Sequence, residues 1–154
     1  MEIILNPIGT IESKVDDHRD DDWGGVTSEI HLDSAQFTEN ALAGLGEFSH
    51  VEVIFQFHRA ADADTNRASR HPRGNTDWPK VGIFAQRGKD RPNHIGATIC
   101  KIVAVHGFTV KVRGLDAFDG TPVLDLKPVM QEFVPERSDI GQPDWATELM
   151  KQYF

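Results

Sequence analysis

The chain has 154 residues, of which 39% are hydrophobic and 26% charged, so its length and composition suit one globular domain over residues 1–154 with a core of its own. Its single cysteine, Cys100, excludes an intrachain disulfide and a zinc site built on several thiolates. No apolar run approaches the roughly 20 residues of a membrane span, and no signal-peptide pattern opens the chain, so we expect a cytoplasmic protein without a membrane partner.

The pattern along the chain is mainly that of a β protein. Six segments with alternating or β-branched residues are predicted as strands: 8–11, 28–32, 50–58, 95–105, 108–113 and 120–128. In the third segment, Val51, Val53 and Phe55 recur at every second position and are expected to face the core. His106-Gly107 separates the fourth and fifth segments and predicts a hairpin turn.

Helix signals are few. Helix-forming residues from Ser34 to Leu45 predict one short helix, and a second is predicted in a helical tail over 143–154, capped by Asp144. In that tail, Trp145, Leu149 and Tyr153 recur at a spacing of four residues. The fold class is therefore mainly β, a single closed or nearly closed β-barrel with one or two short helices, or alternatively a sandwich.

Charge is unevenly distributed along the chain, whose net value is −8 at pH 7. Five aspartates fall between Asp16 and Asp22, whereas the segment from Arg59 to Arg91 carries eight Lys or Arg against four Asp. Acidic surfaces repel phosphates, but a basic segment can bind a polyanion on one face. The polar stretch from Ala60 to Lys80 predicts a long loop, which is either functional or simply solvated.

Two polar segments are candidates for a small-ligand site. In the first, Asp119-Gly120 predicts a turn whose carboxylate suits a ribose hydroxyl pair or an ammonium group, although a plain turn explains it equally well. Gly120 does not stand in a calcium loop, because Leu115 and Ala117 occupy ligand positions. In the second, Arg87 and Arg91 flank a turn at a strand end, where scaffolds often hold functional loops, although such arginines are commonly surface charges.

The seven histidines do not form a recognisable metal motif, and no metal is predicted. His50 and His58 would lie about 26 Å apart along one strand, too far for a shared ion. His58 is the exception of interest, since it ends a strand beside Arg59 and can face the same opening as Arg87. Dinucleotide, P-loop and serine-hydrolase motifs are absent from the sequence.

Taken together, these segments resemble one known family. Six ordered stretches carry the likeness: Ile8–Ser13, Gly44–His58, Gly82–Arg87, Arg91–Gly96, Leu115–Pro122 and Leu124–Pro128. Over about residues 3–128 the chain resembles the TrmO family, also called TsaA-like or YaeB-like. This is a family of S-adenosylmethionine-dependent tRNA methyltransferases built on a single β-barrel.

The resemblance implies S-adenosyl-L-methionine as cofactor and N6-methylation of threonylcarbamoyladenosine at tRNA position 37, in the anticodon loop. It also implies a homodimer. Carried over by motif, the cofactor contacts are His58, Arg59, Arg87, Ala97, Thr98, Asp119, Gly120, Thr121 and Pro122. An arginine suits the cofactor's carboxylate, and an aspartate suits its ribose.

The chain departs from the family pattern in two segments. The N-terminal loop lacks a Pro-Arg-Gln cofactor contact, for which Arg19 or Trp23 is a candidate replacement. The Arg87–Gly96 segment lacks the family's Ser-Pro after Arg87 and has His94 in place of proline. Many family members also carry a further C-terminal domain, whereas 26 residues (154 − 128) follow Pro128 here.

The methyl acceptor is therefore open to three hypotheses. The basic segment from Arg59 to Arg91 favours tRNA, with the acidic run expected to lie elsewhere on the surface. A different acceptor and a non-catalytic S-adenosylmethionine-binding module are the alternatives. For the acceptor, we expect substrate contacts from Arg91 and Asn93, and positioning or proton transfer by Asn93, Asp125 and Lys127.

Overall fold

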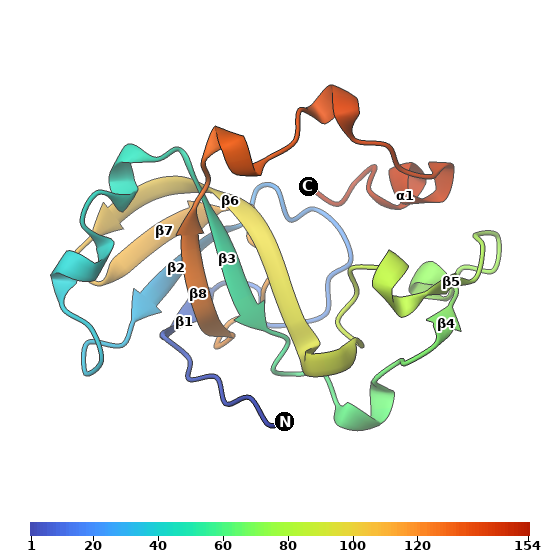
Figure 1. Cartoon of the computed structure of the whole chain (residues 1–154), viewed down its shortest axis with the longest axis horizontal. Helices are drawn as coiled ribbons and strands as arrows, with labels where there is room; N and C mark the ends of the chain where they lie inside the picture. The colour runs from blue at the N-terminus through green and yellow to red at the C-terminus, as the bar shows by residue number, and fades with distance from the viewer.

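The computed structural model describes all residues from 1 to 154 and contains a closed barrel of antiparallel strands (Figure 1). Around the barrel the strands are β1 (Gly9–Ser13), β2 (Thr27–Leu32), β7 (Thr109–Arg113), β6 (Ile95–His106), β3 (His50–Gln56) and β8 (Pro122–Pro128). Strand β8 pairs again with β1 and closes the ring. The predicted β-barrel and its six strands are confirmed, and the sandwich is excluded.

The core lies inside the barrel and follows the alternation of β3. Val51, Val53 and Phe55 are all buried there, at 0%, 0% and 1% exposure, as the pattern predicts. Strand β3 pairs with β6 on one side and with β8 on the other. Opposite Phe55, residue 96 of β6 must be glycine, because a Cβ there would lie 2.5 Å from the Phe55 ring.

Three long loops meet at one end of the barrel. They are residues 14–26 between β1 and β2, residues 57–94 between β3 and β6, and residues 114–121 between β7 and β8. Antiparallel pairing dictates this, because β1, β3 and β7 end where β2, β6 and β8 begin. We call this the loop end, and the candidate site is built there.

Both predicted helices differ from what the structure shows. The helix over Ser34–Leu45 is wrong: the chain instead makes 3-10 turns at Glu39–Leu42 and Leu45–Glu47, because Gly44 between them has a left-handed φ of 83°. Helix α1 spans only Asp144–Leu149, and its N-cap residue is Pro143, which makes no side-chain capping bond. The helical stripe therefore ends before Tyr153.

The long loop between β3 and β6 has structure of its own. Within it, β4 (Ser69–Arg70) and β5 (Val81–Gly82) form a two-stranded sheet beside the barrel (Figure 1). The remaining 3-10 turns of the chain are Asp62–Asp64, Pro72–Gly74, Ile83–Ala85, Pro92–His94, Gln131–Phe133 and Arg137–Asp139. No helix of the protein has the length and apolar character that a membrane crossing requires.

The close packing of Phe55 on Gly96 makes a stability prediction. Substituting Gly96→Ala inserts a methyl group into filled space, and such overpacking typically costs about 1–3 kcal/mol of unfolding free energy. Urea denaturation should show this loss, whereas Gly25→Ala should cost much less, since no atom lies within 4 Å of a Cβ at position 25. Equal urea midpoints for Gly96→Ala and Gly25→Ala would contradict the close packing of the Phe55 ring on residue 96.

Candidate cofactor site

The turn from Asp119 to Pro122 is fixed by bonds to β1. The main-chain nitrogen of Ser13 donates to Asp119 Oδ1 at 2.9 Å, and that of Gly120 donates to the Ile11 carbonyl at 2.8 Å. Gly120 has a φ of 75°, which explains the glycine. Thr121 is 2% exposed, and its hydroxyl lies 3.2 Å from Nδ1 of His58. The turn therefore meets His58 as the motif comparison implies.

His58 and Arg59 follow β3 and lie over this turn. Burial, followed by the positive charge of Arg59, lowers the pKa of His58, so its neutral imidazole is favoured near neutral pH. The Arg59 guanidinium lies 5.2 Å from the centre of the Phe118 ring and donates to the Asp16 carbonyl. Arg59 thus joins the loop 114–121 to the loop 14–26.

An aromatic and cationic stack continues from Phe118 into the N-terminal loop. The rings of Phe118 and Trp23 lie 6.1 Å apart, and the Arg19 guanidinium lies 5.8 Å from the centre of Trp23. Trp23 is 3% exposed and supports the loop from within. Arg19 and Trp23 therefore both belong to the loop end, but the buried ring of Trp23 acts as packing.

Arg87 approaches β6 from the long loop. Its guanidinium donates to the main-chain carbonyl of Ala97 at 2.5 Å and forms no ion pair with a carboxylate of the chain. Next along β6, the hydroxyl of Thr98 donates to Asp116 Oδ1 at 2.5 Å, and the other oxygen of Asp116 accepts a hydrogen bond from the Tyr153 hydroxyl. Asp116 and Tyr153 were not among the candidate residues predicted from the sequence.

The residues expected to act on the acceptor are dispersed. Asp125 and Lys127 form an ion pair of 2.7 Å, with side chains 46% and 59% exposed, on the outer wall of β8. Arg91 donates to the Gln86 carbonyl at 2.8 Å within its own loop. Asn93 has a left-handed φ of 66°. It lines a polar hollow of about 420 Å³ with Gln56, Asp62, Thr65, Arg67 and His94.

The acidic run does not lie apart from the basic loop, so that expectation is wrong. Arg73 forms an ion pair of 2.8 Å with Asp21, and it also donates to the Asp20 carbonyl. Asp90 accepts from both Arg70 and Lys89, at 2.7 and 2.8 Å. Opposite charges attract across these short separations, so three of the eight basic residues of the segment are paired with carboxylates within the chain.

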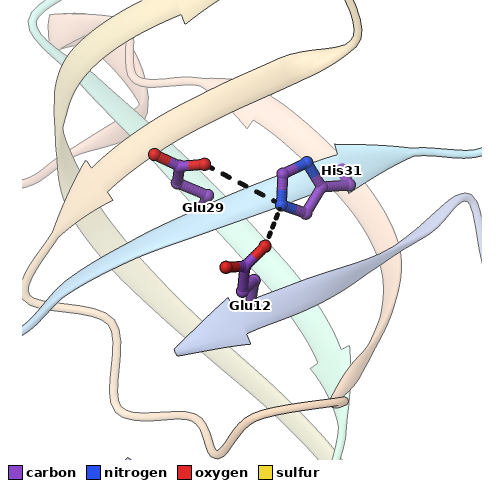
Figure 2. Close-up of side chains that lie close together, drawn as sticks. All are labelled: Glu12, Glu29 and His31. Atoms are coloured by element: carbon purple, nitrogen blue, oxygen red, sulfur yellow. Dashed lines mark hydrogen bonds and ion pairs between the residues drawn. The ribbon is translucent and has the colours of Figure 1, made fainter. Parts of the chain in front are cut away.

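One group of possible metal ligands lies on the outer face of β1 and β2. Figure 2 shows Nε2 of His31 directed at carboxylate oxygens of Glu12 and Glu29, 2.9 and 3.9 Å away. Lys111 lies 3.3 Å from the other Glu29 oxygen, and Nδ1 of His31 lies 3.0 Å from the Thr109 hydroxyl. Since these polar groups already pair with one another and are partly exposed, we describe the cluster as a surface ion-pair network.

With the loop end described, comparison with known proteins places the chain. The family model of the tRNA-methyltransferase O N-terminal domain matches residues 21–134. The chain therefore belongs to the TrmO N-terminal domain family, as its motifs predict. A crystal structure of TrmO from Pseudomonas aeruginosa superposes with a TM-score of 0.75 and 26% identity, over 94% of this chain and 62% of that chain.

Curated relatives of the chain differ in name and in length. The mouse tRNA (adenine(37)-N6)-methyltransferase is 42% identical over 62% of this chain, which spans 22% of that protein. The Escherichia coli protein of the same name is 36% identical over 73% of this chain and 50% of its own length. A probable S-adenosyl-L-methionine-binding protein of Methanothermobacter thermautotrophicus is 36% identical over 86% of this chain and 93% of its own.

The lowered pKa of His58 gives a pH prediction. Because the folded pKa lies below the unfolded value near 6.5, the unfolded chain takes up the proton first, and stability falls as pH drops through this range. Urea denaturation between about pH 7.5 and 5 should therefore show a steeper loss of stability for the unmodified protein than for His58→Gln. If the free energy of unfolding falls equally steeply with pH in the two proteins, the statement that His58 is neutral in the folded state is contradicted.

Proposed function

We propose that this protein binds S-adenosyl-L-methionine at the loop end and transfers its methyl group to N6 of threonylcarbamoyladenosine at position 37 of tRNA. The proposal is carried by one observation: the residues taken from the family motif come from two loops far apart in sequence, 57–94 and 114–121, and from the starts of β6 and β8, and they gather at one barrel end. The Thr121 hydroxyl of the Asp119–Pro122 turn lies 3.2 Å from Nδ1 of His58, and Arg87 donates to the Ala97 carbonyl at the start of β6.

The charges at the loop end fit this cofactor. Arg87 is free of any carboxylate of the chain, so it can receive the cofactor's carboxylate in a charge-assisted hydrogen bond. Asp119 bonds to Ser13 through Oδ1, and its Oδ2 accepts no bond from the protein, which leaves an acceptor for ribose hydroxyls. The neutral form of His58 adds no positive charge near a ligand that is itself a sulfonium cation.

When bound, S-adenosyl-L-methionine supplies an electrophilic methyl group. The residues of the chain then hold the acceptor nitrogen in line with the methyl–sulfonium bond and keep other nucleophilic atoms away from the methyl group. Such alignment can supply much of the reduction in the activation barrier. Asn93 is the candidate on this chain, because its left-handed backbone is of the kind that clusters at functional sites and its polar hollow borders the strand ends of β3 and β6. We assign the acceptor base to this hollow.

A second function is favoured by a different observation. The Methanothermobacter relative, which matches this chain over nearly its whole length, carries the name of a binding protein and not of a methyltransferase. In addition, the internal pairing of Asp21 with Arg73 removes basic charge that a phosphate backbone would use. A non-catalytic S-adenosylmethionine-binding module, or a methyltransferase with another acceptor, is therefore the alternative.

Cofactor binding is tested at Arg87. A hydrogen bond to a charged group is worth about 1.5–3 kcal/mol, so loss of the exposed Arg87 guanidinium in Arg87→Ala should weaken S-adenosylmethionine binding by about tenfold or more in isothermal titration calorimetry. Arg137→Ala, an exposed arginine in the segment after β8, is the matched control and should bind as the unmodified protein does. Unchanged affinity in Arg87→Ala would refute the assigned site.

The acceptor is tested on nucleosides. The protein is incubated with labelled cofactor and bulk tRNA from cells lacking the methyl group, and the tRNA is digested and examined by mass spectrometry. We expect label in threonylcarbamoyladenosine. Label in another molecule would select the different-acceptor alternative, and tight cofactor binding without any transfer would select the binding module.

We also propose a homodimer. The inward faces of β3 fill the core, so an interface must use outer surfaces, and β6 carries exposed apolar side chains at Ile99 and Val103, 46% and 51% exposed. Two-fold pairing of one such patch is the commonest closed arrangement. Light scattering at micromolar concentration should give twice the chain's mass, and Ile99→Lys should shift it toward the monomer. A monomeric unmodified protein would rule out this assembly.

A further inference from the structure

The segment from residue 144 to residue 154 returns to the loop end, and neither the family motifs nor the proposed reaction uses it. After β8 the chain crosses the barrel to α1 and then comes back beside the loop 14–26 (Figure 1). Main-chain nitrogens of Asp22 and Trp23 donate to the carbonyls of Gln152 and Tyr153, each at 2.8 Å. A Cβ on Gly24 would lie 2.6 Å from the main chain of Phe154, so the two segments are in close contact.

Tyr153 stands at the centre of this contact. Its hydroxyl donates to one oxygen of Asp116, while Thr98 on β6 donates to the other oxygen at 2.5 Å. Burial and the Asp116 carboxylate raise the pKa of Tyr153, so the phenol keeps its proton and remains a donor. The positive charges of Arg73 and Arg87 act on the same phenol in the opposite direction but are outweighed.

We propose that the 144–154 segment forms one wall of the cofactor site and that Tyr153 is a positioning residue for the cofactor. This inference rests on the proposed function. The contacts form one connected series: Tyr153 holds Asp116, Asp116 holds Thr98, and the adjoining Ala97 carbonyl accepts from Arg87. Without the phenol hydroxyl, one oxygen of Asp116 loses its partner and the carboxylate can turn away from Thr98.

The segment is held independently of the site as well. The indole nitrogen of Trp78 donates to Glu148 at 3.1 Å, at the α1 end of the segment. The Tyr153 and Phe154 rings pack edge to face with centroids 4.8 Å apart, a contact that phenylalanine at position 153 would keep. Tyr153→Phe and Trp78→Phe can therefore separate the role of the Tyr153 hydroxyl from the general attachment of the segment to the protein.

The experiment measures cofactor affinity and thermal stability on the full-length protein and four variants. The variants are Tyr153→Phe, Asp116→Asn, their double substitution and Trp78→Phe. Because a hydrogen bond to a charged group is at stake, Tyr153→Phe should weaken S-adenosylmethionine binding by about tenfold in calorimetry. The double variant should bind about as weakly as the single ones, since contacts in one series are not additive. Trp78→Phe should lower the melting temperature while leaving affinity unchanged.

The outcomes separate this inference from the proposed function. If the unmodified protein binds the cofactor and Tyr153→Phe binds it equally well, the positioning role is refuted and the proposed function stands. Tighter binding by Tyr153→Phe also refutes it, because the segment would then obstruct the site. If the unmodified protein does not bind the cofactor at all, the proposed function fails, and the role of Tyr153 fails with it.

Discussion

The closure of the barrel depends on the short seam between β1 and β8, where register pairing covers only Gly9 with Val123 and Thr10 with Pro122. The Asp119–Pro122 turn lengthens this seam: Gly120 donates to the Ile11 carbonyl, and Ile11 donates to the Thr121 carbonyl at 2.9 Å. The same turn supplies the carboxylate proposed to hold the ribose. Fold closure and ligand binding thus share one stretch of backbone, and a change at Asp119 should disturb both.

Charged side chains take part in holding the loops at this end to one another. A net charge of −8 would repel an anionic ligand if it were spread evenly. Here the acidic run is drawn onto the basic loop through Asp21 and Arg73, and Arg59 stacks on Phe118. Arg87 remains without a carboxylate partner. The site therefore offers a guanidinium to a ligand carboxylate within an acidic protein, which suits a small zwitterionic cofactor.

Sequence patterns predicted the strands well, because alternation in a half-buried strand is a local property. Val51, Val53 and Phe55 show it, and their burial follows. The Ser34–Leu45 helix failed for an equally local reason: Gly44 takes a left-handed conformation that composition alone did not reveal. The two-residue strands β4 and β5 are too short to leave a pattern.

The site was predictable only in part. Residues carried by the motif, such as Asp119 and His58, do lie at one barrel end, and the family resemblance pointed to them. Contacts between distant segments had no local signal: Tyr153 meets Asp116 across 37 residues, and Arg73 meets Asp21 across 52. Asp116 belongs to the same motif as Asp119, and this nearness in sequence was the one clue to its role. Tyr153 has no such clue, and only the three-dimensional fold places it beside Asp116.

The central claim is that the loop end of the barrel is the cofactor site. The most direct measurement is a crystal structure of the protein with S-adenosylhomocysteine, the product that lacks the transferable methyl group. The account predicts ligand density at the loop end, with the ligand's carboxylate on Arg87, its ribose on Asp119 and one side of the pocket formed by the segment that carries Tyr153. Density bound elsewhere on the barrel, with Arg87 and Asp119 free of ligand, would contradict it.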